Sequence, residues 1–322
     1  MDTGSHLLFG ATLSGIALFH PAVAQDPALS SAVVAASLIG SHAPDFDSAM
    51  RLFGREKYLK HHRGVSHSIP AWFLWSGAIG ALTAWAAGEM THMALLISIA
   101  FAAVVIHVLF DYTNGYGVQW LRPFSGRWLH LDTLTLTDPW LFCLHASAAI
   151  AAIYGEPLVV SWTCLSSWAA TVIYVAWRIA HHRLVVRRVR RRFRRWRSSY
   201  VLPGLWWFRW QYVVQTDKGF ETGTIEGRRW LPSATVPVCE EHACVEASRR
   251  ADAVRTLRGF AKKEYVSWAA LSDGGYVVTW TDMRFWRPGE WPYRARVTLD
   301  ERMNIVREEL GWHKKTWEAP FV

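Results

Sequence analysis

At 322 residues the chain has the length of about two domains, and its composition changes near residue 200. The formal net charge of +9 comes from one stretch, because residues 178–197 contain ten arginines and no acidic residue. The rest of the chain is close to neutral, which excludes a protein that is basic over its whole surface. The cysteines lack the spacing of a disulfide framework or a paired zinc ribbon: Cys143, Cys164, Cys239 and Cys244.

The first 180 residues are largely apolar and contain six segments that we expect to form helices. They lie at about residues 7–20, 29–43, 69–87, 92–110, 140–154 and 158–178. Several reach the ~17–25 residues that cross a bilayer, whereas the second and fifth are shorter, at about 15 residues. The third, fourth and sixth carry almost no charge, which favours membrane helices over a soluble helical core. No basic region precedes the first segment, so we expect a retained helix rather than a cleaved signal peptide.

Basic residues are confined to alternate connections between these segments. Lys and Arg are absent from residues 20–28, 88–91 and 155–157, which follow the first, third and fifth segments. The other connections and the sequence after the sixth segment carry Arg51, Arg55, Lys57, Lys60, Arg63, Arg122, Arg127 and then the arginines of 178–197. Because basic residues mark the cytoplasmic side, we expect a multi-pass protein with both termini in the cytoplasm.

Residues with the chemistry of metal ligands gather on the same, cytoplasmic side. The seven candidates are His6, Asp45, Asp47, His62, His67, His107 and Asp111. Of these, His107 and Asp111 are four residues apart and point the same way from one helix. A mixed nitrogen and oxygen set suits zinc, manganese or iron, of which we expect zinc. Because seven ligands exceed the needs of one ion, the set predicts one or two divalent ions, about 3.5–4 Å apart if there are two.

Arg63, Asp111 and His67 are the candidates for catalysis. Asp111 and His67 belong to the ligand set, and the Arg63 guanidinium is placed to meet the negative charge of a phosphoryl oxygen. The hydroxyls of Ser66 and Ser68 are further donors for such an oxygen.

Other polar residues of this region have a structural interpretation. His42, His61 and His92 lie at helix ends, where a solvated histidine is the more common case. Asp138 precedes Pro139, so it fits a helix N-cap at least as well as a metal ligand.

Taken together, these residues resemble the YdjM-like membrane-bound metal-dependent hydrolases. The motifs follow one another in order over roughly residues 1–180: Met1-Asp2 with His6, Pro44-Asp45-Phe46-Asp47, His62-Arg63-Gly64-Val65-Ser66-His67-Ser68, His107-Val108-Leu109-Phe110-Asp111, Asn114-Gly115-Tyr116-Gly117, Pro123-Phe124 and Asp138-Pro139. Ser5 stands where the family usually has threonine, which leaves His6 in place. The resemblance implies a bacterial inner-membrane protein with a metal-dependent hydrolase site, and it implies a site more firmly than a substrate. The step from His107 to Asp111 is also similar, more loosely, to one in zinc-dependent phospholipases C and related nucleases.

The arginine-rich stretch Arg178–Arg197 has two interpretations. It can bind nucleic acid, or it can lie on anionic lipid headgroups directly after the last membrane segment, at about 1 kcal/mol per basic residue. We favour membrane lipids, because apolar residues are spaced to give this stretch an apolar face: Leu184, Val185, Val189, Phe193 and Trp196.

After this stretch the sequence predicts a small soluble α+β domain. Strands are expected at Trp206–Thr216, Phe220–Leu231, Tyr265–Leu271, Tyr276–Arg284 and Tyr293–Leu299, and one helix at Val245–Phe260. The turns Asp217-Lys218-Gly219 and Asp273-Gly274-Gly275 separate neighbouring strands. The expected organisation is therefore a helical membrane domain (1–180) with the metal site, a juxtamembrane segment (181–198) and a cytoplasmic α+β domain (199–322).

Two classes of function fit these expectations. The first is a hydrolase that uses a divalent metal to cleave a lipid or small phosphoester, or another ester. The second is a non-catalytic membrane anchor in which the same residues form a structural metal clip. The hydrolase is favoured, because a closed structural site needs only about four ligands, and seven candidates beside an arginine leave room for water and substrate.

Overall fold

In the computed structural model the described residues are 1–53, 58, 62–193, 195–285 and 292–312. The chain divides into two compact units, Met1–Ser48 with His62–Arg183 and Ala49–His61 with Leu184–Val322. The first is helical and the second contains two antiparallel sheets, which confirms the expected fold class. Five basic residues or histidines used above lie outside the described residues: Arg55, Lys57, Lys60, His61 and Arg194.

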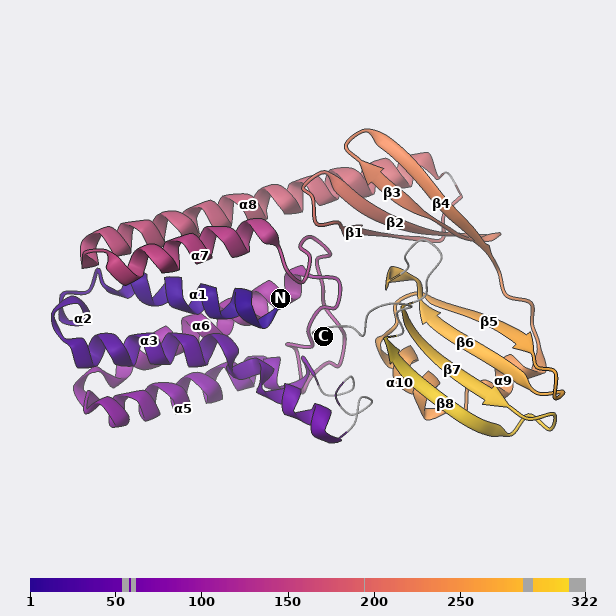
Figure 1. The fold of residues 1–322 in the computed structure, drawn as a ribbon, viewed down its shortest axis with the longest axis horizontal. Coiled ribbons are helices and arrows are strands. Elements are labelled where there is room, and N and C mark those ends of the chain that lie inside the picture. The colour runs from indigo at the N-terminus through magenta and orange to yellow at the C-terminus, as the bar shows by residue number, and fades with distance from the viewer. Residues whose placement is uncertain (54–57, 59–61, 194, 286–291, 313–322) are drawn as a thin grey trace. The chain divides into compact units, whose positions relative to one another are not determined.

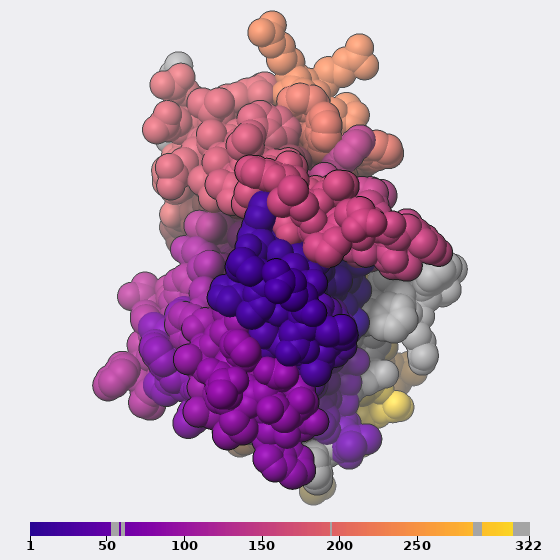
Figure 2. Space-filling model, turned by 90° about the vertical axis from the view of Figure 1, so that its left-hand side faces the viewer, coloured from indigo at the N-terminus to yellow at the C-terminus, as the bar shows by residue number. Residues whose placement is uncertain are grey.

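The helical unit contains a helix for each of the six apolar segments. Its α-helices are α1 (Thr3–Ala17), α2 (Pro21–Gln25), α3 (Pro27–His42), α5 (Ile69–Ala87), α6 (Met93–Thr113), α7 (Pro139–Tyr154) and α8 (Pro157–Arg192). Short 3-10 helices are η1 (Ala43–Phe53), η2 (Val65–His67) and η3 (Met90–His92). In the ribbon view α1 lies between α7 and α3 (Figure 1). The end-on view likewise places the indigo α1–α3 segment between the purple and the magenta helices (Figure 2).

Carboxylates and prolines fix where these helices begin. Asp26 accepts hydrogen bonds from the backbone of Ala28 and Leu29 ahead of α3, with Pro27 as the first helical residue. Asp138 does the same at α7, accepting from the backbone of Trp140 and Leu141. Its other oxygen accepts from the Tyr174 hydroxyl at 2.9 Å. The capping role expected for Asp138 is therefore confirmed.

Polar side chains join the helices inside the bundle. The imidazole of His145 on α7 is fully buried between Thr12 of α1, 2.7 Å from Nδ1, and Thr171 of α8, 2.8 Å from Nε2. Both threonines also donate to carbonyls one turn earlier in their own helices. Such contacts satisfy buried polar groups where water is absent.

Within the described residues, three helices are long and apolar enough to cross a membrane: Ile69–Ala87, Met90–Thr113 and Pro157–Arg192. Helix α7 is apolar but shorter. The protein is therefore a membrane protein by the length and composition of its helices, and six crossings remain a prediction.

We expect the region after α1 and the region after α8 to lie on opposite sides of the membrane, because basic residues are absent from 20–28 and abundant after Arg178. Reporter fusions after residue 24 and after residue 200 test this arrangement. Opposite signals are expected, and the same signal from both fusions would contradict it.

The packing of α5 against α6 depends on Gly80. A Cβ at Gly80 would lie 2.5 Å from backbone and side-chain atoms of Ile97, whereas a Cβ at Gly77 of the same helix meets nothing within 4 Å. We expect Gly80→Ala to destabilise the protein by about 1–3 kcal/mol through overpacking. Thermal unfolding in detergent measures the effect. Gly77→Ala is the matched control and should be neutral or stabilising, because alanine favours helix more than glycine does. Equal unfolding temperatures for the two variants would contradict this account of the interface.

The last part of α8 carries the first sheet of the second unit. The strands are β1 (Ser198–Pro203), β2 (Arg209–Thr216), β3 (Gly219–Glu226) and β4 (Arg229–Pro237), in the order β1-β2-β3-β4. Val185 and Val189 of α8 are buried against this sheet with Val201, Trp210 and Ile225. Part of the apolar face expected on lipid thus packs against protein, while Leu184 remains 55% exposed.

The second sheet is the core of an α/β plait. It contains β5 (Glu264–Ala270), β6 (Tyr276–Asp282), β7 (Tyr293–Leu299) and β8 (Ile305–Trp312), with helices α9 (Ala243–Ser248) and α10 (Asp252–Phe260). The expected turns before Gly219 and at Gly274 are confirmed, and both glycines have the positive φ that these turns require.

Several expected boundaries in this unit are wrong. The single helix Val245–Phe260 is two helices, since Ser248 ends α9 and accepts the Trp280 indole N–H at 2.9 Å, while α10 begins at Asp252. Strand β2 begins at Arg209 rather than Trp206, because the preceding residues form a turn. The expected strand Phe220–Leu231 is interrupted at Gly227, which has a positive φ.

Candidate metal centre

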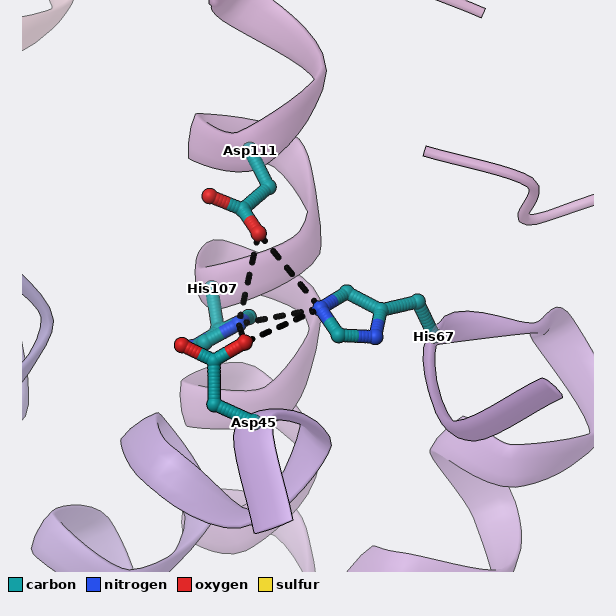
Figure 3. A group of neighbouring side chains, drawn as sticks. All are labelled: Asp45, His67, His107 and Asp111. Carbon is teal, nitrogen blue, oxygen red and sulfur yellow. Dashed lines mark hydrogen bonds and ion pairs between the residues drawn. The ribbon is translucent and has the colours of Figure 1, made fainter. Parts of the chain in front are cut away.

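Four side chains of the expected ligand set converge inside the helical unit: Asp45, His67, His107 and Asp111, called the tetrad below (Figure 3). Asp45 lies in η1 just after α3, and His67 ends η2 just before α5. His107 and Asp111 project from successive turns of α6. The fold thus joins three segments that are separate in sequence.

The ligand atoms of the tetrad are spaced closely enough to hold one metal ion. His67 Nε2 lies 3.5 Å from Asp45 Oδ1, 3.4 Å from Asp111 Oδ2 and 3.3 Å from His107 Nε2. His107 Nε2 lies 3.5 Å from Asp45 Oδ1 and 3.7 Å from Asp111 Oδ2. Ligand atoms placed tetrahedrally at about 2.0–2.2 Å from zinc would be about 3.3–3.6 Å apart. The tetrad therefore has the dimensions of a site for a small divalent metal ion.

The two carboxylate oxygens of the tetrad are buried without a hydrogen-bond partner. Asp45 Oδ1 and Asp111 Oδ2 are both in this state, although each faces two imidazole nitrogens and Asp111 Oδ2 also forms an ion pair with Arg63. His107 directs its Nδ1 at the Ser41 carbonyl oxygen, 2.7 Å away, and donates its ring proton there. Its Nε2 is then unprotonated, and the lone pair of this nitrogen points at the carboxylates. This is the usual orientation of a metal-ligating histidine. The lone pairs of this nitrogen and of the two carboxylate oxygens fit a divalent cation.

His67 is oriented in the same way through a relay. Its Nδ1 lies 2.9 Å from Ser66 Oγ, and Ser66 donates its hydroxyl proton to Asp47 Oδ2 at 2.5 Å. Burial alone would lower the pKa of His67, but the carboxylates of Asp111 and Asp45 raise it to about 9. The two buried carboxylates therefore favour positive charge beside them, as in a cation site.

A second group, Asp45 with Asp47 and His62, shares one carboxylate with the tetrad. His62 Nδ1 lies 2.6 Å from Asp47 Oδ1, and the Arg63 backbone N–H donates to Asp47 Oδ2 at 3.0 Å. Burial opposes the ionisation of Asp47, yet the hydrogen bond to His62 holds the pKa of this carboxyl below its usual value. The side chains of His62 and Asp47 are 15% and 11% exposed, so this group is nearer to solvent than the fully buried His67 and Asp111.

His6 and Arg63 lie around Asp111. His6 Nε2 is 3.3 Å from Asp111 Oδ1, and its ring stacks on that of His107 with centroids 3.8 Å apart. The Met1 amino group contacts the same Asp111 oxygen and lies 2.9 Å from His6 Nε2. Arg63 Nε is 3.0 Å from Asp111 Oδ2, and its Nη1 donates to Asn114 Oδ1 at 3.1 Å.

All seven expected ligands therefore lie in or beside one site, where they form distinct groups. Four form the tetrad, two complete the second group, and His6 contacts Asp111 from the other side. The two serines expected to meet substrate donate inside the protein, Ser66 to Asp47 and Ser68 to the Val65 carbonyl. The Ser41 carbonyl, which orients His107, was missed because backbone groups leave no signal in a sequence.

Known proteins resemble both parts of the chain. The model of the YdjM inner membrane protein family matches residues 1–185, and that of the YfhP C-terminal alpha/beta plait domain matches residues 243–318. The chain is 32% identical to the uncharacterized protein YfhP of Bacillus subtilis (strain 168), over 97% of this chain and 95% of that protein. No solved structure matches.

Proposed function

The chain belongs to the YdjM inner membrane protein family, and from this membership and the tetrad we propose that it is a metal-dependent hydrolase. Its substrate would be an ester or phosphoester, lipid-linked or soluble, reached at the cytoplasmic face of the bacterial inner membrane. The protein would cross this membrane several times with both termini in the cytoplasm.

One observation carries this proposal: Asp45 belongs both to the buried tetrad and to the more exposed group with Asp47 and His62. The tetrad would hold one divalent ion, with zinc favoured over manganese or iron by its nitrogen and oxygen donors. The second group would hold another ion, with Asp45 shared between the two. Bound there, a divalent ion supplies Lewis acidity and lowers the pKa of a water molecule toward neutrality.

The residues of the chain have distinct roles in this proposal. Asp111 and His67 hold the metal, and the Ser66–Asp47 relay keeps the His67 ring in position. Arg63 is fixed by Asp111 and Asn114. Because a guanidinium has five N–H donors, donors remain for the oxygen on which negative charge develops.

A second candidate function is the non-catalytic anchor with a structural metal clip. One observation favours it: the tetrad offers four closely spaced protein ligands, and structural zinc sites are closed in this way. In that case, the shared Asp45 and the nearby Arg63 would have no substrate to meet.

Elemental analysis of the purified full-length protein, combined with a panel of phosphodiester and lipid ester substrates, tests the proposal. We expect bound divalent metal and a hydrolysis rate that falls on chelation and returns when zinc or manganese is restored. Bound metal with no turnover across the panel would favour the structural clip.

A further inference from the structure

The turn between β1 and β2 exposes four large apolar side chains in succession. The exposed fractions are 60% for Leu205, 67% for Trp206, 36% for Trp207 and 54% for Phe208. The turn is well defined, since the Gly204 N–H donates to the Arg209 carbonyl at 2.8 Å and the Arg209 N–H to the Trp206 carbonyl at 3.0 Å. Exposed apolar groups that are held in place in this way are typical of interaction sites.

The contacts of α8 with the sheet show at which end this turn lies. The Phe193 ring packs on Tyr212, in the middle of β2, with centroids 5.6 Å apart. Five residues earlier in α8, Arg188 Nη1 donates to the Gly227 carbonyl at 2.9 Å, and the Gly227 N–H donates to the Phe208 carbonyl at 2.9 Å. The turn therefore lies at the end of the sheet near Arg188, directly beside the turn between β3 and β4.

The surroundings of the turn are basic. The exposed arginines Arg228 and Arg229, on the turn between β3 and β4, directly follow Gly227, which donates to Phe208. Neither arginine forms an ion pair with a described residue. Guanidinium groups beside exposed tryptophans match an anionic lipid surface, where tryptophan occupies the headgroup level and arginine binds phosphate.

We propose that Leu205–Phe208 inserts into the headgroup region of an anionic bilayer and that the flanking arginines bind lipid phosphates. The turn would then bind the membrane together with the arginine-rich stretch. Val185 and Val189 of that stretch are covered by the sheet, so the turn supplies exposed apolar side chains in their place. This inference does not depend on the proposed hydrolase activity.

Photo-crosslinking in reconstituted full-length protein tests the inference. p-Benzoylphenylalanine replaces Trp206, or Phe208 as a second site, in vesicles of phosphatidylglycerol and phosphatidylcholine. Val306 on β8 is 67% exposed and serves as the matched control position. We expect lipid adducts at Trp206 and Phe208 to exceed those at Val306 several-fold.

Adducts to lipid in equal amounts at all three positions would overturn the proposal, as would crosslinks to protein, including a second copy of the chain. In vesicles of phosphatidylcholine alone we expect a several-fold lower yield, and an unchanged yield would contradict the role of the arginines. Both replaced side chains are solvent-exposed, so the variants should keep the unfolding temperature of the unmodified protein.

Discussion

Asp111→Asn is expected to remove bound metal from the protein and to abolish any activity that depends on it. Asp111 supplies a fully buried oxygen, Oδ2, to the tetrad, and the same oxygen forms an ion pair with Arg63 Nε, 3.0 Å away. Asparagine keeps the shape but removes the negative charge, so metal affinity should fall by more than the ~10–100-fold typical of losing a residue that only orients a ligand. Elemental analysis of protein purified in detergent measures the loss.

Asp138→Asn is the matched control for this change. Asp138 is also buried, but it caps α7, and asparagine caps helices about as well as aspartate does. Its metal content should equal that of the unsubstituted protein. If Asp111→Asn and Asp138→Asn retain equal metal while both keep their helix content by circular dichroism, the tetrad is misassigned. His67→Gln provides an independent test with the same expected loss, because it removes a ligand without disturbing the Asp111–Arg63 pair.

Arg63→Ala is expected to lower turnover by about 100-fold or more while metal remains bound, once the substrate panel has identified a substrate. The guanidinium is not a metal ligand, and it is held by Asp111 and Asn114 beside the tetrad. Kinetics and elemental analysis on the same preparation separate the two effects. Arg63→Lys controls for charge, because it keeps a positive group beside Asp111 but loses the planar donor geometry. Its turnover should therefore lie between that of Arg63→Ala and that of the unsubstituted protein.

Deletion of residues 199–322 distinguishes the enzyme from the anchor. For a hydrolase this deletion should leave metal binding and much of the turnover, because all seven candidate ligands lie in the other unit. The truncated protein should also carry Val185→Ser and Val189→Ser. Removal of the sheet would otherwise leave both valines exposed. If the deletion abolishes function while Arg63→Ala is silent, the hydrolase proposal is refuted.

The ligands could be predicted from sequence because their chemistry is carried by residue type and by helical spacing. His107 and Asp111 lie one turn apart on a helix, and His67 and Asp45 lie next to helix ends on the expected side of the bundle. The division of seven candidates into the tetrad, the second group and His6 was not predictable. It depends on distances of a few ångströms between residues that are up to 105 positions apart, which no local pattern encodes.

The second unit was predicted less well for similar reasons. Strand β1 is short and directly follows the arginines, so it shows little alternation before the turn at Gly204. The exposed turn Leu205–Phe208 has the composition of a buried strand, which is why the start of β2 was placed too early. Apolar composition alone does not distinguish a core strand from a surface that meets lipid.

Helix α8 runs without interruption from Pro157 to Arg192, and its residues Val185 and Val189 lie one turn apart against the β1–β4 sheet. A single residue inserted between these two valines would rotate one of them by about 100° relative to the other, so only one could remain buried against the sheet. The packing of the sheet therefore fixes the number of residues between Val185 and Val189, and changes in length here should be tolerated far less than in a flexible linker.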